Sequence, residues 1–444
     1  MSKGLNVLMG GIPVGRLEQM DTGVLAFEYD DRWLAADRIQ IPLSMSLPLA
    51  AKRHAGPLVA NYLWNLLPDN DRTLQTWGQI YGVSPNSPFA LLSKVGEDCA
   101  GAVQVVTDEW IAANANPAGD VQWIDEAEVG RRLKRLREER TWTGRRAGDR
   151  GHFSLAGAQP KMALLFDGQR WGVPSGRRAT THIMKPPMPG LNGSTENEYA
   201  CLRLARRVGI VGAEAKVGHF EDETAIVVTR YDREQGADGA VRRFHQEDMC
   251  QALGVHPAKK YQNEGGPSIE QIANEVLRYA TDPEGDKARF AEMIAFNFLV
   301  LGTDAHAKNF SVIHLPLRRM YLAPMYDVLS YVPYDDDEYE RRRLRMAMKI
   351  GGYYKFDQIQ PRHWERQATM MGMDPEAMVA RVFDLAEKIP DALSDVIKEC
   401  REDGLTEPLL DRMLDGISAR CASMVEVYPT HHRDPRAVRD GVED

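Results

Sequence analysis

The sequence lacks most of the features that mark secreted, membrane-bound or zinc-binding proteins. Its 444 residues hold five cysteines that lie far apart without a C-x-x-C pair, so neither a zinc site nor a disulfide framework is indicated. No uninterrupted apolar run is long enough to span a bilayer, and the start of the chain lacks the apolar stretch of a secretory signal. We therefore expect a cytoplasmic protein that has reduced cysteines and no membrane partner.

An excess of positive charge is also missing. The chain carries 55 Lys and Arg residues against 64 Asp and Glu residues, so on average it repels a nucleic-acid backbone. Direct DNA binding would therefore need a local basic patch or a basic partner. The length allows two or three domains, and the balance of apolar and charged residues is that of an ordinary soluble protein.

The spacing of apolar residues predicts an α+β chain in which strands dominate first and helices later. Strands are predicted within residues 5–27 and at 101–106, 161–166, 181–184 and 225–229. Helices are predicted at 129–140, 196–208, 269–279, 287–301, 375–387 and 408–428.

Changes in composition divide the chain into four segments. These are an α/β subdomain at 1–145, a small sheet-containing lobe at 146–246, an α-helical lobe at 247–428 and a polar tail at 429–444. The Gly- and Arg-rich residues 143–151 are typical of a mobile loop or hinge, and the acidic-to-basic block 335–343 of a solvated loop.

The strongest chemical signal is Asp304 followed by Asn309 and, further on, by Asp327. Phosphoryl transfer to a hydroxyl needs a carboxylate that orients the hydroxyl, and a carboxylate plus an amide oxygen that hold magnesium. In protein kinases the base and the metal-binding Asn follow the spacing D-x-x-x-x-N, which Asp304 and Asn309 share. Because short patterns often arise by chance, this one depends on its neighbours for support.

Two upstream features supply a possible phosphate site. Small residues around Gly157, ahead of Lys161, would let backbone N–H groups approach phosphate oxygens, although a plain turn explains the same residues. Lys185 ends a predicted strand, where it could reach the α- and β-phosphates, and an acid of the next helix would hold it in place. Glu198 is the better candidate for that acid, and Glu196 is the alternative.

The apolar strand that ends at Thr229, Arg230 and Tyr231 runs into a charged turn before the helical lobe. Backbone groups at such a turn can bind an adenine edge while Tyr231 covers the ring, although a simple strand end explains these residues equally well. The loop, the strand lysine, the helix acid, the hinge, the base and the metal ligands nevertheless occur together in kinase order. The set therefore favours phosphotransfer.

The chain resembles the HipA-type serine/threonine kinase toxins of bacterial type II toxin–antitoxin systems over nearly its whole length. The matching segments lie at residues 66–69, 96–103, 154–161, 182–185, 197–199, 246–251, 302–311 and 325–327. The resemblance implies a two-lobed protein-kinase-like fold, with a β-rich amino-terminal subdomain and a mainly α-helical carboxyl lobe.

The resemblance also implies roles for individual residues, with ATP and Mg²⁺ as cofactors. Asp304 would be the catalytic base, and Asn309 and Asp327 would be the magnesium ligands. Ser154 would be autophosphorylated, which silences the kinase by displacing the phosphate loop; a phosphoserine adds about two negative charges. The implied ATP contacts are Ala156, Gly157, Ala158, Gln159, Pro160, Lys161, Lys185, Thr229, Arg230, Tyr231, His306, Ala307, Lys308, Asn309, Tyr326 and Asp327.

Two residues depart from the family pattern, because Pro160 and Thr229 each stand where relatives carry an acid. The implied partners are a small helix-turn-helix antitoxin, operator DNA bound through that antitoxin, and a protein substrate such as an aminoacyl-tRNA synthetase, with the glutamyl enzyme favoured. Two other interpretations stay open. One is a catalytically silent nucleotide-binding corepressor scaffold, and the other is a kinase for small molecules or lipids.

Overall fold

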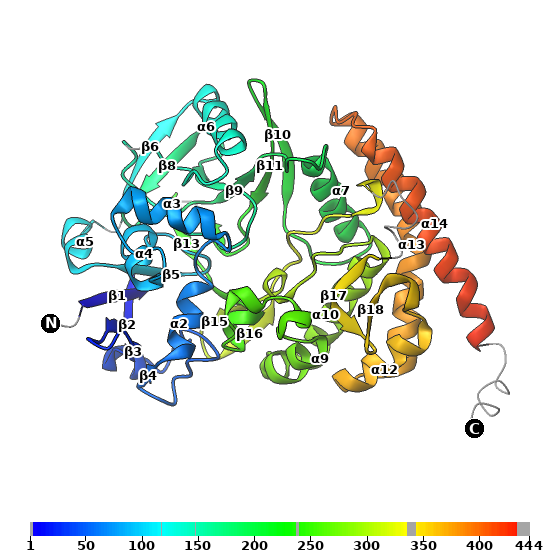
Figure 1. The fold of residues 1–444 in the computed structure, drawn as a ribbon, viewed down its shortest axis with the longest axis horizontal. Helices are drawn as coiled ribbons and strands as arrows, with labels where there is room; N and C mark the ends of the chain where they lie inside the picture. Colours follow the sequence, from blue (N-terminus) through cyan, green and yellow to red (C-terminus); the bar gives the residue numbers. More distant parts are fainter. Residues whose placement is uncertain (1–2, 117, 147, 237–238, 335–342, 433–444) are drawn as a thin grey trace.

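A computed structural model describes residues 3–116, 118–146, 148–236, 239–334 and 343–432. Figure 1 shows an amino-terminal subdomain, in blue, beside a small lobe and a larger helical lobe. Most of the acidic-to-basic block predicted as a solvated loop, and residues 433–444 of the predicted tail, lie outside the described residues. Within the described residues, no helix is long and apolar enough to cross a membrane.

The amino-terminal subdomain is an antiparallel five-stranded sheet in the order β4-β3-β2-β1-β5, covered by short helices. Alternate residues of its strands are apolar, and they bury one face of the sheet against the helices; Leu17, Phe27 and Leu63 are almost fully buried. Its elements are β1 (Lys3–Met9), β2 (Ile12–Gln19), β3 (Leu25–Tyr29), α1 (Asp31–Leu34), β4 (Arg53–Ala55), α2 (Pro57–Trp64), α3 (Asp71–Tyr81), α4 (Pro88–Val95), β5 (Val103–Val106) and α5 (Asp108–Ala113).

The small lobe contains a six-stranded antiparallel sheet in the order β10-β11-β9-β7-β8-β6. The strands predicted at 161–166, 181–184 and 225–229 are its central strands. Its elements are β6 (Asp120–Ile124), α6 (Glu126–Glu138), β7 (Met162–Phe166), β8 (Trp171–Ser175), β9 (His182–Lys185), α7 (Ser194–Arg207), β10 (Ala215–Phe220), β11 (Glu223–Thr229), β12 (Arg233–Gln235) and β13 (Val241–Arg243).

Part of the charged stretch before β7 is packed into the small lobe. Arg132 of α6 is 1% exposed and bonds both carboxylate oxygens of Asp149, at 2.7 and 2.8 Å. Arg145 is also buried, with its guanidinium over the ring of Phe153. Residues 143–145 and Asp149 of the predicted loop or hinge are thus buried, while Arg146, Gly148 and Arg150 are exposed. Pairing of β6 with β8 also joins residues 120–124 to the small-lobe sheet, although composition groups them with the preceding subdomain.

The large lobe is mainly helical, with a three-stranded sheet, β14-β15-β16, beneath the predicted catalytic loop. Its elements are β14 (His245–Asp248), α8 (Met249–Ala252), η1 (Pro257–Lys259), η2 (Gln262–Glu264), α9 (Ile269–Gln271), η3 (Ile272–Val276), η4 (Leu277–Tyr279), α10 (Pro283–Leu299), η5 (Ala307–Asn309), β15 (Ser311–Leu315), β16 (Arg319–Leu322), η6 (Val332–Tyr334), β17 (Arg345–Ile350), β18 (Tyr353–Lys355), η7 (Phe356–Gln358), α12 (Pro361–Met371), α13 (Pro375–Glu402) and α14 (Leu409–His432).

Two predicted helices differ from the structure. The one predicted at 269–279 is a single α-turn followed by a π-turn and a 3₁₀ turn. The one predicted to end at 387 continues through Pro390 to Glu402, because Ile389 and Leu393 remain in the core and their burial outweighs the local cost of a proline. In addition, α14 extends to His432, past the predicted start of the tail.

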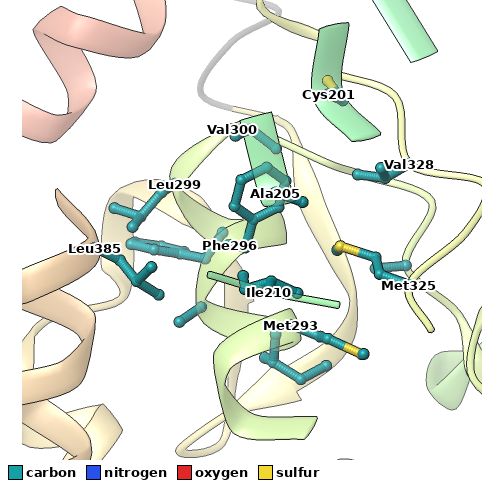
Figure 2. Close-up of a cluster of buried hydrophobic side chains, with 14 of the residues drawn as sticks. Cys201, Ala205, Ile210, Met293, Phe296, Leu299, Val300, Met325, Val328 and Leu385 are labelled. Carbon is teal, nitrogen blue, oxygen red and sulfur yellow. The ribbon is translucent and has the colours of Figure 1, made fainter. Parts of the chain in front are cut away.

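One hydrophobic core connects the lobes beneath the predicted site. Figure 2 shows Phe296 of α10 among side chains of α7 and α13 and beside Met325 and Val328. Phe296 is fully buried, and Met325 and Val328 are each 2% exposed. This packing places α7, which carries the predicted helix acid, and the segment around Asp327 on the same rigid support.

Candidate active site

The phosphate loop is a tight turn, and the side chain of Lys161 at its end bonds back to the main chain of the loop. Gly157 has φ +104°, and a Cβ there would lie 2.5 Å from Lys161 Nζ, so only glycine fits without movement. Lys161 Nζ donates a hydrogen bond to the carbonyl oxygen of Ala156, at 2.7 Å. Burial lowers the pKa of Lys161 to about 8. In the nucleotide-free protein the positive charge of Lys161 is thus poorly stabilised. A bound phosphate would stabilise that charge.

The outer part of the loop offers fewer donors than the sequence suggests. Ala158 is exposed, and Gln159 Nε2 donates to the carbonyl oxygen of Pro186 at 3.2 Å. Pro160 has no N–H group and so contributes no backbone donor to a phosphate. Backbone donors are thus available only from residues on either side of it.

Lys185 joins the two lobes through its ammonium group. From the end of β9, its Nζ donates to Glu198 of α7 at 2.8 Å and to Asp327 at 2.6 Å. Burial alone would lower the pKa of Lys185, but the two carboxylates raise it overall. Burial tends to raise the pKa of Asp327, and Lys185 and Lys161 nevertheless hold it well below its usual range. Glu196, the alternative acid, instead accepts a hydrogen bond from the hydroxyl of Thr195.

The segment that carries Asp327 is held against the small lobe by main-chain bonds. Met325 N donates to Val211 O, and Ala213 N donates to Met325 O, both at 2.8 Å. Asp327 has φ +55°, a left-handed conformation that Asp tolerates better than most residues. The hairpin of β15 and β16 lies between Asn309 and Asp327 and brings the chain back to the same place, as the sequence predicts.

The predicted catalytic loop is braced within the large lobe. Gly302 N donates to Asn297 O at 2.7 Å, and a Cβ on Gly302 would lie 2.4 Å from Asn297 Oδ1. His306 N donates to Asp304 O at 2.8 Å, and Asn309 Nδ2 donates to the same oxygen at 2.7 Å. The amide of Asn309 therefore fixes the main chain at Asp304, while its Oδ1 stays available.

The carboxylate of Asp304 is exposed and accepts a hydrogen bond from the hydroxyl of Tyr261. His306 lies edge-on to the Tyr261 ring, with 5.0 Å between the ring centroids. Burial lowers the pKa of His306, although Asp304 and Asp327 both act to raise it. The imidazole is thus neutral near pH 7, and it interacts electrostatically with both carboxylates.

Lys308 does not lie as predicted, because its side chain points into the interior. Its Nζ donates to Asn65 Oδ1 at 2.7 Å and to Asp248 Oδ2 at 2.8 Å. The side chain is therefore committed to holding the amino-terminal subdomain, and the prediction that it lines the nucleotide site is corrected. The fully buried Ala307 likewise contributes its main chain, since its N–H donates to Lys260 O at 3.3 Å.

Tyr326 and Tyr231 lie side by side at the junction of the lobes, with 5.7 Å between ring centroids. Tyr326 Oη donates to Lys308 O at 2.8 Å and lies 2.6 Å from Ser311 Oγ. These bonds fix Tyr326 against the turn that ends the catalytic loop. The ring of Tyr231, at the hinge, lies beside the fixed ring of Tyr326.

The hinge residues before Tyr231 are largely engaged elsewhere. Thr229 N donates to Glu214 O at 2.8 Å, and Arg230 N donates to Thr181 O at 2.9 Å. The Arg230 guanidinium is 2% exposed and bonds Asp232 at 2.7 and 3.0 Å. The Arg230 side chain thus cannot contact a nucleotide in this conformation. Of the three predicted hinge residues, Tyr231 remains the candidate contact for adenine.

Magnesium fits the two predicted ligands. Asn309 Oδ1 and the second oxygen of Asp327 are free of the bonds made by Asn309 Nδ2 and Asp327 Oδ1. Oxygen ligands of this kind suit Mg²⁺, which usually takes one or two carboxylates and completes its shell with phosphates and water. In the ranges that the structure covers, no three His, Cys, Asp or Glu side chains form an all-protein metal cage.

Ser154 is fully buried beneath the phosphate loop. Its Oγ donates to Leu66 O at 2.6 Å, and its N–H donates to Asp98 O at 2.9 Å. Asp69 N donates to Gly157 O at 3.3 Å in the same contact. The amino-terminal subdomain therefore holds the phosphate loop directly.

Three residues at the site carry no role in the sequence interpretation. Asp69 and Asp98 belong to motifs that match the family, but their local sequence gives no sign of the partners they meet. Asp69 contacts Lys260 at 3.0 Å, and Asp98 contacts Arg233 at 2.9 Å. Tyr261 lies in a loop with no recognisable motif. Only the tertiary structure brings these residues to the site.

The fold and this arrangement define a two-lobed, protein-kinase-like molecule with an additional amino-terminal subdomain. The model for the HipA-like C-terminal domain matches residues 153–393, and the model for the HipA N-terminal domain matches residues 5–106. The chain therefore belongs to the HipA family of serine/threonine kinase toxins.

Individual relatives agree with this assignment. Y4mE of Sinorhizobium fredii is 34% identical over 419 residues, which cover 94% of this chain and 97% of Y4mE. The serine/threonine-protein kinase toxin HipA of Shewanella oneidensis is 28% identical over 405 residues, or 88% of this chain and 89% of that toxin. The solved complex of Shewanella oneidensis HipA, HipB and operator DNA contains a chain that matches with a TM-score of 0.81 and 26% identity, covering 97% of this chain and 99% of that one.

Proposed function

We propose that the chain is an ATP- and Mg²⁺-dependent serine/threonine protein kinase that acts as the toxin of a toxin–antitoxin pair. The observation that carries the proposal is the junction at Lys185, whose ammonium binds Glu198 of the small lobe and Asp327 of the large lobe. This ion pair and the metal-binding Asp must both be in place in an active kinase. The contacts of Lys185 therefore support the proposal of a nucleotide site at this junction.

The chemistry follows from these positions. Asp304 accepts the proton of the acceptor hydroxyl as the hydroxyl oxygen attacks the γ-phosphorus. The bond from this phosphorus to the bridging oxygen breaks, and its electron pair leaves on ADP. Lys185 and Lys161 offset phosphate charge on the small-lobe side. Asn309 and Asp327 would hold magnesium, which would offset further negative charge on the phosphates. His306 remains neutral and packs beside the base.

Ser154 is the proposed site of autophosphorylation and inactivation. In this conformation its hydroxyl is inaccessible, because Oγ is buried and bound to Leu66 O. Transfer to Ser154 therefore requires the loop to leave its place, and a phosphate of about two negative charges would not fit back against that carbonyl oxygen. Phosphorylation would thus trap the loop away from ATP.

The proposed partners follow the relatives. The Shewanella oneidensis protein was solved with HipB and operator DNA, and we extend this to a small helix-turn-helix antitoxin that carries the present chain to its operator. The net charge of −9 supports indirect DNA binding. The proposed substrate is an aminoacyl-tRNA synthetase, with the glutamyl enzyme as the first candidate.

The test is transfer of labelled phosphate from ATP with magnesium after phosphatase treatment of the chain. We expect label on Ser154 and on the synthetase, and a loss of about 10²- to 10⁴-fold in Asp304→Ala, the range for removing a general base. Binding of ATP should persist in that variant. Absence of label on Ser154 and on every synthetase offered would refute the kinase. Transfer to inositol lipids or antibiotics alone would replace it with a small-molecule kinase.

A further inference from the structure

Tyr261 reaches the predicted base from a part of the chain that no motif marks. It lies between η1 and η2, and its hydroxyl donates to Asp304 Oδ1. Its ring is half-buried against His306 in an edge-on contact. It is the one side chain with a recorded hydrogen bond to the Asp304 carboxylate within the described ranges.

The loop that carries Tyr261 is rigidly built. Gly266 N and Glu264 N both donate to Tyr261 O at 3.0 Å. A Cβ on Gly266 would lie 2.1 Å from Lys259 O, so the turn closes too tightly for any side chain there. The loop thus holds the phenol without needing a ligand.

The same loop is joined to the catalytic loop and to the amino-terminal subdomain. Lys260 O accepts from Ala307 N at 3.3 Å, and Lys260 Nζ contacts Asp69 at 3.0 Å. On its other side, Gln262 Oε1 accepts from Lys349 N at 2.6 Å. Tyr261 therefore lies in a loop that is anchored on both sides, next to Asp304.

The phenol can only donate in this contact. Burial, followed by the charge of Asp304, raises the pKa of Tyr261 far above its usual value. Tyr261 therefore keeps its proton at physiological pH and is no rival base. The Asp304 carboxylate is exposed to solvent, so its second oxygen remains open to an acceptor hydroxyl.

We infer that Tyr261 is a positioning residue for phosphoryl transfer: it fixes the rotamer of Asp304 through one carboxylate oxygen, so that the other faces the incoming hydroxyl. A carboxylate on an exposed loop would otherwise sample several rotamers, each of which lowers the fraction of productive encounters. This inference rests on the proposed kinase function. It adds a residue that acts through the base without touching the nucleotide.

Tyr261→Phe tests the inference, because it removes the hydroxyl and keeps the ring against His306. We expect the rate of Ser154 labelling at saturating ATP to fall by roughly tenfold or more, with the KM for ATP changed less than about twofold. The melting temperature should stay close to that of the wild type. Tyr279→Phe is the matched control, since Tyr279 is 58% exposed and remote from the base in sequence.

Each outcome decides between alternatives. If the wild type transfers no phosphate, the proposed function fails and Tyr261 loses its role with it. If the wild type transfers phosphate and Tyr261→Phe matches it, the positioning inference alone is overturned. A faster rate in Tyr261→Phe would make the phenol an occluding group and also overturn it, as would a rise in the KM for ATP with an unchanged maximal rate.

Discussion

The phosphate loop and the catalytic loop are held in different ways. The catalytic loop is braced by its own lobe, through Asn309 Nδ2 on Asp304 O and Gly302 N on Asn297 O. The phosphate loop is braced by another subdomain, through the bond from Ser154 Oγ to Leu66 O and the bond from Asp69 N to Gly157 O. The main chain of the catalytic loop is thus fixed within the large lobe, while the Lys308 side chain reaches Asn65 of the amino-terminal subdomain. The phosphate site depends on how the amino-terminal subdomain docks.

Docking itself relies on buried charge. Asp98 is 3% exposed and contacts Arg233 at 2.9 Å, Arg243 at 3.2 Å and Thr180 Oγ1 at 2.7 Å. Burial tends to raise the pKa of Asp98, but the arginines hold it well below its usual range. Arg230 of the hinge joins the same cluster at 3.6 Å. The amino-terminal subdomain thus contacts both the hinge and the phosphate loop.

The largest expected effect comes from Asp98→Ala, which removes the acid that contacts Arg233 and Arg243 in a buried cluster and leaves Arg233 with Asp232. Breaking a buried pair in this way costs about 3–5 kcal/mol. We expect a stability loss of that size in urea unfolding, with weakened ATP binding. Asp108→Ala is the control, because this exposed acid bonds Arg16 and Asn6 at the surface and should cost less than about 1 kcal/mol. Equal losses of stability in Asp98→Ala and Asp108→Ala would contradict the conclusion that docking relies on buried charge.

A smaller effect is expected from Asp69→Ala, which removes the acid between Lys260 and Lys308. Lys308 keeps Asp248, so the loss should be about 1–3 kcal/mol. Asp69 N keeps its bond to Gly157 O in this variant, whereas Lys260 and Lys308 lose a carboxylate beside the catalytic loop, so the maximal transfer rate should fall more than ATP affinity. Asp71→Ala, an exposed acid two residues on, serves as control. A fall in ATP affinity with an unchanged maximal rate would contradict the assignment.

Ser154→Ala should act more weakly on the fold. It leaves Leu66 O without its donor, at a cost of about 1–2 kcal/mol, and it removes the acceptor of autophosphorylation. We expect ATP affinity to change little, because the loop itself is intact. Mass spectrometry of the loop peptide and thermal unfolding give the two readings, with exposed Ser423→Ala as control. Persisting phosphate on the loop would show that another residue accepts it.

The smallest effect is a pH dependence at Lys161. Its pKa of about 8 lies below the ordinary 10.5 because burial penalises the charge, so the nucleotide-free chain gains stability as pH rises through this interval. ATP favours the charged form, so affinity should fall by up to about tenfold between pH 7 and pH 9. Lys161→Arg stays charged and should lose less affinity, as measured by calorimetry. An equal decline in both proteins would assign the dependence to another group.

Much of the site follows from local spacing. Asp304 and Asn309 lie five positions apart in the same loop, and the apolar run after Asn309 predicts the hairpin that brings back Asp327. The helix after the Lys185 strand likewise predicts an acid at Glu198. These relations span few residues, and the periodicity of helices and strands governs them. They could therefore be predicted without a structure.

The sequence by itself determined the order in which the residues proposed for phosphoryl transfer occur. The tertiary structure alone decided where several of them point. Arg230 and Lys308 occupy predicted nucleotide-site positions in sequence, yet through tertiary contacts Arg230 turns to the carbonyl oxygen of Cys99 and Lys308 to Asn65 Oδ1, each more than a hundred residues away. Tyr261 reaches Asp304 in the same way. A buried charge turns towards whichever partner packing brings near, and packing is a property of the whole chain.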